Sequence, residues 1–177
     1  MKILVVMSNG FEEIEAITVV DVLRRAGIQV DVVGIPSTLI TGKNGVRIIA
    51  DKKFSDINPE DYEGLVIPGG MANVNTLIEY LPLLSLVERF NQQRKIIAAI
   101  CAAPRILAKL GLLRDKKATI YPGLERNLSY PRPEKVVVDG NIVTSQGPGT
   151  AIEFSLKLVE ILSSKQKSEE IRKEIVA

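Results

Sequence analysis

The chain alternates between short aliphatic runs and longer segments in which apolar residues recur every three or four positions. Continuous aliphatic runs are typical of strands that are buried on both faces, and the longer period indicates helices with one apolar side. The runs predict strands at residues 3–7, 30–35, 65–67 and 96–100. The longer pattern predicts helices at residues 12–26, 77–93 with an interruption at Pro82, 102–110, 150–162 with Thr150 as its cap, and a charged tail helix from Lys165.

Turn signals separate these elements. Gly27 follows the first helix where a C-terminal glycine is expected. Residues 41–45 suggest a turn between short strands at 39–40 and 46–50, and Asp139-Gly140 predicts a tight hairpin between strands at 136–138 and 142–144. Residues 58–61 suggest a short capped helical turn, residues 118–120 a short strand, and residues 122–133 a loop. Alternating strands and helices predict an α/β fold with a mostly parallel sheet, formed by one domain over residues 1–177.

Composition narrows the class of protein. The 177 residues are 46% hydrophobic and 25% charged, with a net charge of +2, which argues against a dedicated nucleic-acid surface. One cysteine cannot form an internal disulfide, which suits a reducing cytoplasm. No signal peptide is recognisable, and no apolar run approaches the roughly 18 residues of a membrane span. We therefore expect a cytoplasmic protein.

Cys101 is the most informative residue. It follows the predicted strand 96–100 and precedes a helix, so it lies where backbone N–H groups converge. Such a position favours the thiolate, and in α/β folds it faces the ligand-binding edge of the sheet. The alternative is an inert, buried cysteine, because free cysteines are among the most buried residues. The chain contains no histidine, so a Cys-His-Asp or Ser-His-Asp relay within it is excluded.

Other candidates occupy the same predicted edge. Glu15 could meet the thiol from the first helix, although glutamates in a first turn are also explained by the helix dipole. Gly69 and Gly70 follow the strand 65–67, and they could either make a tight turn or expose N–H groups to an oxyanion. The Lys and Ser/Thr of a phosphate loop are missing there.

Three motifs together resemble the ThiJ/PfpI superfamily. They are Glu12-Glu13-Ile14-Glu15, Pro68-Gly69-Gly70, and Ala98-Ala99-Ile100-Cys101-Ala102-Ala103-Pro104. The segment from Ser145 to Phe154 is similar to the entry into the last helix of this superfamily. The branch that these motifs resemble is that of the parkinsonism-associated protein deglycase and its bacterial ThiJ-like relatives.

The resemblance implies a flavodoxin-like α/β/α sandwich, related to class I glutamine amidotransferases. Cys101 would be the nucleophile on a strained elbow, and a protonated Glu15 would hydrogen-bond its thiolate. Backbone N–H groups at Gly69, Gly70 and Ala102 would form the oxyanion pocket. The family forms homodimers, so the Gly147-Pro148-Gly149 loop of a partner could contribute. No cofactor or metal is implied.

Departures from the family pattern restrict the activity. Tyr121 stands where many members have a histidine, and Arg25 resembles an arginine at the edge of the site in the animal proteins. Gln146 replaces another of their arginines. Cys101-Ala102 replaces the Cys-His pair of the peptidase branch, so peptidase activity is disfavoured, and the missing histidine excludes glutamine amidotransferase activity.

Three functional hypotheses follow. The leading one is a glyoxalase or deglycase that acts on methylglyoxal-like dicarbonyls or on early glycated adducts through the Cys101 thiolate, with Glu15 as proton shuttle. The second is a redox sensor or stress chaperone in which Cys101 is oxidised without turnover. The third is an interaction module with an inert thiol.

Overall fold

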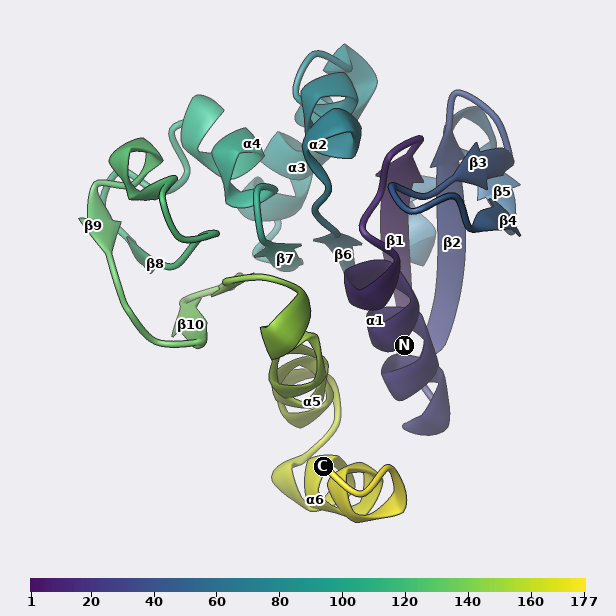
Figure 1. Cartoon of the computed structure of the whole chain (residues 1–177), viewed down its shortest axis with the longest axis vertical. Coiled ribbons are helices and arrows are strands. Elements are labelled where there is room, and N and C mark those ends of the chain that lie inside the picture. The colour runs from purple at the N-terminus through teal and green to yellow at the C-terminus, as the bar shows by residue number, and fades with distance from the viewer.

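The computed structural model describes residues 1–177 and builds the fold around a seven-stranded sheet of order β10-β11-β7-β6-β1-β2-β5 (Figure 1). All neighbouring strands are parallel except β10 and β11, which form the predicted antiparallel hairpin. The strands of this sheet are β1 (Lys2–Ser8), β2 (Gln29–Ile35), β5 (Lys52–Lys53), β6 (Gly64–Ile67), β7 (Ile96–Ile100), β10 (Val136–Asp139) and β11 (Ile142–Ser145). The α/β class and the mostly parallel sheet predicted from the sequence are confirmed.

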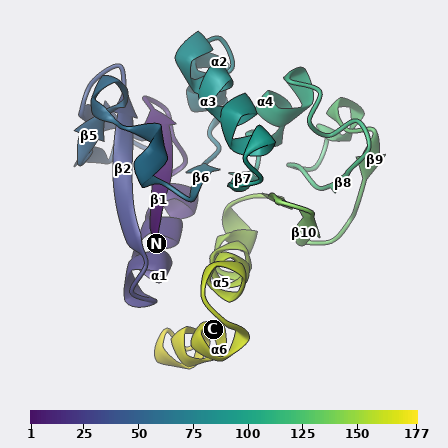
Figure 2. The same cartoon turned by 180° about the vertical axis from the view of Figure 1, so that it is seen from behind.

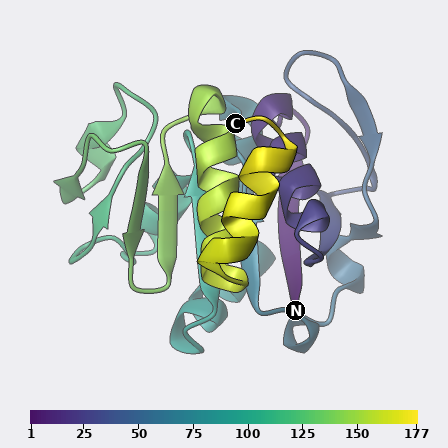
Figure 3. The ribbon, with the colours of Figure 1, turned by 90° about the horizontal axis from the view of Figure 1, so that it is seen from below.

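Helices cover both faces of the sheet. They are α1 (Glu13–Arg25), α2 (Met71–Leu77), α3 (Leu81–Gln92), α4 (Pro104–Lys109), α5 (Ala151–Leu162) and α6 (Lys165–Glu174). Figures 1 and 2 show α1, α5 and α6 on one side and α2, α3 and α4 on the other. In Figure 3, α6 lies over α5 and beside α1. None of the helices combines the length and apolar character needed to cross a lipid bilayer.

Alternation along β1 produces two separate cores. Ile3, Val5 and Met7 point into the core with α1, α5 and α6. Leu4 and Val6 point into the core with α2, α3 and α4. Successive side chains of a strand point to opposite faces, so an uninterrupted aliphatic run can fill both cores.

Two smaller sheets complete the fold. β3 (Leu39–Thr41) and β4 (Arg47–Ile49) form the predicted hairpin beside α1, while β8 (Lys117–Ala118) pairs with β9 (Tyr130–Pro131). Residues 122–133 are thus not entirely a loop, and the predicted strand at 118–120 begins and ends earlier. The short helical turn predicted at residues 58–61 is present as a 3-10 turn at Pro59–Asp61, and the side chain of Asn58 accepts a hydrogen bond from Glu60 N–H.

Several predicted helix boundaries are wrong. The segment predicted over residues 77–93 with an interruption at Pro82 is interrupted earlier, at residues 78–80, because α2 ends at Leu77 and Pro82 lies in the first turn of α3. A proline is readily accommodated there, since the first helical N–H groups need no partner within the helix. The helix predicted from residue 102 begins at Pro104, and α5 begins without a side-chain cap from Thr150.

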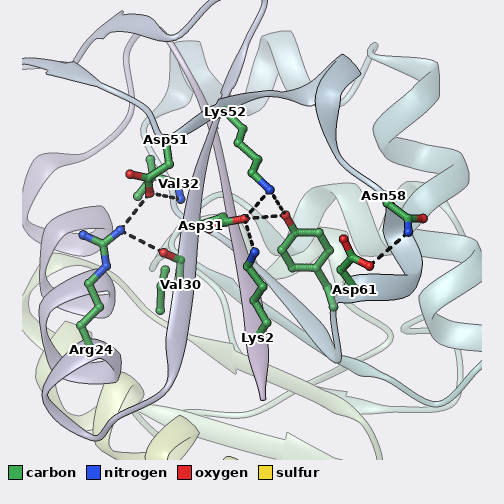
Figure 4. A network of polar contacts seen from close by, with 10 residues as sticks. Lys2, Arg24, Val30, Asp31, Val32, Asp51, Lys52, Asn58 and Asp61 are labelled. Carbon is green, nitrogen blue, oxygen red and sulfur yellow. Dashed lines mark hydrogen bonds and ion pairs between the residues drawn. The ribbon is translucent and has the colours of Figure 1, made fainter.

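A polar network joins the amino-terminal ends of the central strands (Figure 4). The Asp31 carboxylate pairs with Lys2 at 2.9 Å and Lys52 at 3.1 Å, and it accepts a 2.6 Å hydrogen bond from the hydroxyl group of the buried Tyr62. Parallel strands align their carboxyl ends at the opposite edge, and the candidate site lies at that edge.

Candidate active site around Cys101

Cys101 occupies a sharp elbow between β7 and α4. Its φ of 65° is in the left-handed region, which is uncommon for a residue with a side chain. Two backbone hydrogen bonds hold the elbow: Cys101 N–H donates to Ser145 O at 3.0 Å, and Tyr121 N–H donates to Cys101 O at 2.9 Å. A strained backbone conformation of this kind persists only where contacts with the surrounding structure fix it in place. The predicted strained elbow is therefore present.

Glu15 reaches the same place from the first turn of α1. Its side chain is fully buried, and Oε2 accepts a 2.6 Å hydrogen bond from Gly69 N–H. The other oxygen, Oε1, has no hydrogen-bond partner. A Cβ atom placed on Gly69 would lie 2.6 Å from Glu15 Oε2 and 3.0 Å from Cys101 Sγ. The carboxyl group and the thiol thus flank one small space, as the sequence predicts.

The Pro68-Gly69-Gly70 turn supplies part of the surroundings of the sulfur. Backbone N–H groups of Gly70 and Ala102 act on the sulfur and lower the pKa of Cys101, as expected of donors in an oxyanion pocket at this position. Gly70 has a φ of 90°, and a Cβ atom there would collide with Gly10 O. The prediction that Gly69 also serves as an oxyanion donor is wrong, because its N–H is already committed to Glu15.

Burial dominates the protonation of this pair. Burial raises the pKa of Glu15 to about 7, although the hydrogen bond from Gly69 opposes the increase. Burial also raises the pKa of Cys101, and a negative charge on Glu15 raises it further. The N–H groups of Gly70 and Ala102 act in the opposite direction but do not prevail. The lowered thiol pKa expected from sequence position is therefore wrong for the resting site, which holds a thiol beside a carboxyl group that titrates near neutrality.

A pocket of about 240 Å³ opens onto the sulfur. Its lining residues are Glu12, Lys43, Gly70, Met71, Cys101, Ala102, Tyr121, Leu124 and Pro148. Glu15 is not among them, so a molecule in the pocket meets Cys101 but not the carboxyl group behind it. This geometry argues against Glu15 as a carrier of protons to and from the carbon atoms of a substrate.

Of the remaining predicted residues, those near the Gly147-Pro148-Gly149 loop lie at the pocket and Arg25 does not. Tyr121 is 47% exposed and lines the pocket, and Pro148 lines it from the same chain, with Gly147 packed against the Tyr121 ring. Arg25 is not at the edge of this site. It ends α1, ten residues or about 15 Å along the helix axis from Glu15, and pairs with Asp21 and with Glu174 of α6.

Some residues of the site were not predicted from the sequence. Asn73 is fully buried, donates to Pro68 O at 2.9 Å and Gly69 O at 3.0 Å, and accepts from Ser8 N–H at 2.6 Å. It thereby ties the glycine turn to the end of β1. Lys43, Met71 and Leu124 line the pocket, and none of them belongs to a motif. The structure groups no three His, Cys, Asp or Glu side chains as a metal site.

Comparison with known proteins identifies similar chains of nearly the same length. The model of the DJ-1/PfpI family matches residues 1–161. Protein dj-1beta of Drosophila melanogaster is 39% identical over 175 residues, which are 96% of this chain and 94% of that protein. A protein named deglycase from Pyrococcus horikoshii is 33% identical over 166 residues, or 92% of this chain and 99% of that protein. The structure of oxidized DJ-1 from Toxoplasma gondii has a TM-score of 0.95 and 37% identity, covering 99% of this chain and 97% of that one.

Proposed function

Because this chain belongs to the DJ-1/PfpI family, we propose that it is a cysteine-dependent enzyme of the glyoxalase or deglycase type. Its substrates would be methylglyoxal-like dicarbonyls or the early adducts that they form with amines and thiols. The resemblance to the ThiJ/PfpI superfamily is confirmed by the family match, and the deglycase name of the Pyrococcus horikoshii relative supports the reaction class. The observation that carries the proposal is the pairing of Cys101 and Glu15 beneath an open pocket.

The first step is attack by sulfur on an aldehyde. Glu15 takes the thiol proton as Cys101 Sγ bonds to carbon one of methylglyoxal, and the carbonyl electron pair moves to oxygen. A base is most effective when its pKa lies near the working pH, and the pKa of Glu15 is raised to about 7 by burial. Glu15 Oε2 and Cys101 Sγ flank the same small space beside Gly69, so the carboxyl group lies next to the thiol proton.

Backbone groups then stabilise the adduct. The N–H groups of Gly70 and Ala102, which lower the pKa of Cys101 in the resting site, would stabilise the oxygen that gains charge. Solvent in the open pocket protonates that oxygen to give the neutral hemithioacetal, and proton transfer between its carbon atoms yields a lactoyl thioester on Cys101. Water attacks the thioester carbon and breaks its bond to sulfur, which releases lactate and restores the thiol. No external oxidant is needed, because carbon one is oxidised while carbon two is reduced.

Multiple-turnover conversion of methylglyoxal to lactate tests the proposal. Wild type should form many equivalents of lactate per chain, whereas Cys101→Ser should form none above the uncatalysed rate. Glu15→Gln should also lose turnover, because the amide cannot accept the thiol proton. Unimpaired turnover in either variant, or a wild type that consumes one equivalent and stops, contradicts the proposal.

A redox function is the second candidate. The relative from Toxoplasma gondii is described as oxidized, and in this chain the N–H groups of Gly70 and Ala102 could hold the oxygens of an oxidised Cys101. A sensor reacts once with a peroxide, so the same turnover assay separates it from an enzyme. Intact-mass measurement after peroxide treatment, with Cys101→Ser as control, would detect the added oxygens.

We also propose that the protein is a homodimer. Ile17 on α1 and Ile49 on β4 are 43% and 80% exposed and line a groove of about 330 Å³ between α1 and the hairpin. Ile14, three residues before Ile17 on α1, is 56% exposed. A second copy of the chain would remove this apolar surface from water. Sedimentation equilibrium should give twice the mass of the chain for wild type, with a shift to monomer for Ile17→Glu combined with Ile49→Glu. A wild type that sediments as a monomer at micromolar concentration contradicts the proposal.

A further inference from the structure

The proposed reaction needs a group that moves a proton between two substrate carbons, and Glu15 is badly placed for it. Glu15 is fully buried and does not line the pocket that opens onto Cys101. A proton-transfer group must come within hydrogen-bond distance of the atom that it serves. Glu15 meets this condition for the thiol proton, but it does not line the pocket in which a substrate would lie. The chain has no histidine to take over the task.

Glu12 is the carboxylate that does line the pocket. It immediately precedes α1, and its N–H donates to Gly69 O at 3.1 Å. A Cβ atom on Gly70 would lie 2.9 Å from Glu12 N, so the backbone of Glu12 packs directly against the turn that carries the oxyanion donor. The Glu12 side chain is 8% exposed, and Oε2 lies 3.4 Å from Lys43 Nζ. A nearly buried carboxylate therefore shares one wall of the pocket with Cys101.

A purely structural role for Glu12 would be to anchor the β3–β4 hairpin, but its neighbour already does this. Glu13 Oε1 accepts hydrogen bonds from Asn44 N–H at 2.7 Å and Val46 N–H at 3.4 Å. Glu13 Oε2 accepts a third from the Asn44 amide at 3.0 Å. Glu12 contributes only the longer contact with Lys43, whose side chain is 60% exposed. The anchoring of the hairpin thus does not explain a second carboxylate aimed into the pocket.

We infer that Glu12 is the catalytic base that isomerises the substrate adduct on Cys101, and that Lys43 is its positioning residue. The inference rests on the proposed glyoxalase-type function. Glu12 removes the proton from carbon one of the hemithioacetal, and the electrons of that C–H bond form a double bond between carbons one and two. The electron pair of the carbon-two carbonyl moves to its oxygen, which takes the proton of the carbon-one hydroxyl. Glu12 then returns its proton to carbon two, which leaves the lactoyl thioester.

The test compares Glu12→Gln with Glu13→Gln in the full-length protein. Lactate formation from methylglyoxal reports turnover, and the rate of Cys101 alkylation by iodoacetamide reports the thiol separately. Removing a proton-transfer group typically costs about 100- to 10,000-fold in kcat, and we expect a loss in that range for Glu12→Gln. Its alkylation rate should stay close to that of wild type, because Glu15 and the elbow are untouched. Glu13→Gln keeps an oxygen that can accept the hydrogen bonds from Asn44 N–H and Val46 N–H, so it should preserve the hairpin and retain most of the turnover.

Lys43→Met provides a second variant that leaves both carboxylates in place and changes an exposed side chain. A positioning role predicts a lower kcat with little change in KM, whereas a substrate-binding role would raise KM. Should Glu12→Gln fail to fold, unchanged kcat in Lys43→Met would overturn the inference. If wild type is active and a folded Glu12→Gln variant keeps full turnover, the role of Glu12 is overturned while the proposed function stands. A wild type without multiple turnover overturns the proposed function, and this inference with it.

Discussion

Cys101 lies among groups with opposite effects on its proton. The N–H groups of Gly70 and Ala102 stabilise a thiolate, while burial and the charge on Glu15 stabilise the thiol, and the second pair prevails. The sequence predicts the position of Cys101 and of its partner Glu15, because each of them lies in one of the family motifs. It does not predict the net direction of the pKa, which depends on how deeply the chain buries each atom. Gly69 shows the same limitation, because its single N–H could serve either an oxyanion or Glu15.

Glu15→Gln should lower the pKa of Cys101, because it removes the negative charge next to the sulfur. Neighbouring charges typically change a pKa by about 1–3 units, so the thiolate should form at correspondingly lower pH. The measurement is the ultraviolet absorbance of the thiolate as a function of pH, with Cys101→Ser as the blank. Glu13→Gln is the matched control, since Glu13 binds the hairpin and does not line the space between Glu15 and Cys101. An unchanged titration in Glu15→Gln would show that the two groups are not coupled.

Gly69→Ala should be destabilising and should also slow alkylation of Cys101. Its Cβ atom would lie 2.5 Å from Cys101 Cβ and 2.6 Å from Glu15 Oε2, so the elbow or the carboxyl group must move. Overpacking of this kind typically costs about 1–3 kcal/mol in the free energy of unfolding. Gly149→Ala is the control, because a Cβ atom there meets nothing within 4 Å. Equal stability of the two variants in urea denaturation would contradict the expected collision.

At the scale of elements, loops that follow different strands converge at one sheet edge. Strands β1, β6, β7 and β11 could be predicted because their aliphatic runs are unbroken, and their order then brings Glu15, Gly70 and Cys101 together. α2 could not be predicted, because seven residues are too few to show a helical period. Asn73, which α2 carries, was therefore missed as well. Lys43 and Leu124 reach the pocket through tertiary packing, which leaves no local periodic signal.

The loop between β11 and α5 depends on one hydroxyl group. Thr150 Oγ1 accepts a hydrogen bond from Gly147 N–H at 3.1 Å, donates to Gly147 O at 2.9 Å and lies 2.7 Å from Ser145 Oγ. Thr150→Val should lower the free energy of unfolding by about 1–3 kcal/mol, since it leaves buried polar atoms without partners. Thr150→Ser keeps the hydroxyl group and should lose much less in thermal or urea denaturation. A loss in Thr150→Ser as large as that in Thr150→Val would contradict the dependence on the hydroxyl group.

At the scale of the whole molecule, the Asp31 network joins β1, β2 and β5 to Tyr62, two residues before β6 (Figure 4). Burial alone would raise the pKa of Asp31, but hydrogen bonds from Tyr62, Lys2 and Lys52 lower it to about 2. The network lies at the amino-terminal ends of the strands, away from Cys101. It should therefore influence the stability of the sheet without altering the chemistry of the pocket.

This network should make stability depend on pH in the acidic range. The folded pKa of Asp31, about 2, lies below its ordinary value of 3.8, so the unfolded chain takes up the proton first as the pH falls. The stabilisation is complete above about pH 5 and is lost as the pH falls toward 2. Asp31→Asn should be less stable than wild type at pH 7, and the difference should shrink as the pH falls in that range. Urea denaturation at several pH values tests this, with the exposed Asp115→Asn as control, and a constant difference would contradict it.

The separation between the Asp31 network and the pocket also affects how this protein can evolve. A new substrate preference requires changes in Lys43, Tyr121 or their neighbours, and most such changes reduce stability. A compensating mutation around Asp31 would act through a different edge of the sheet, and distant sites usually combine additively. Directed evolution of the pocket should therefore tolerate more mutations when it starts from a variant that has first been stabilised at the amino-terminal ends of the sheet strands.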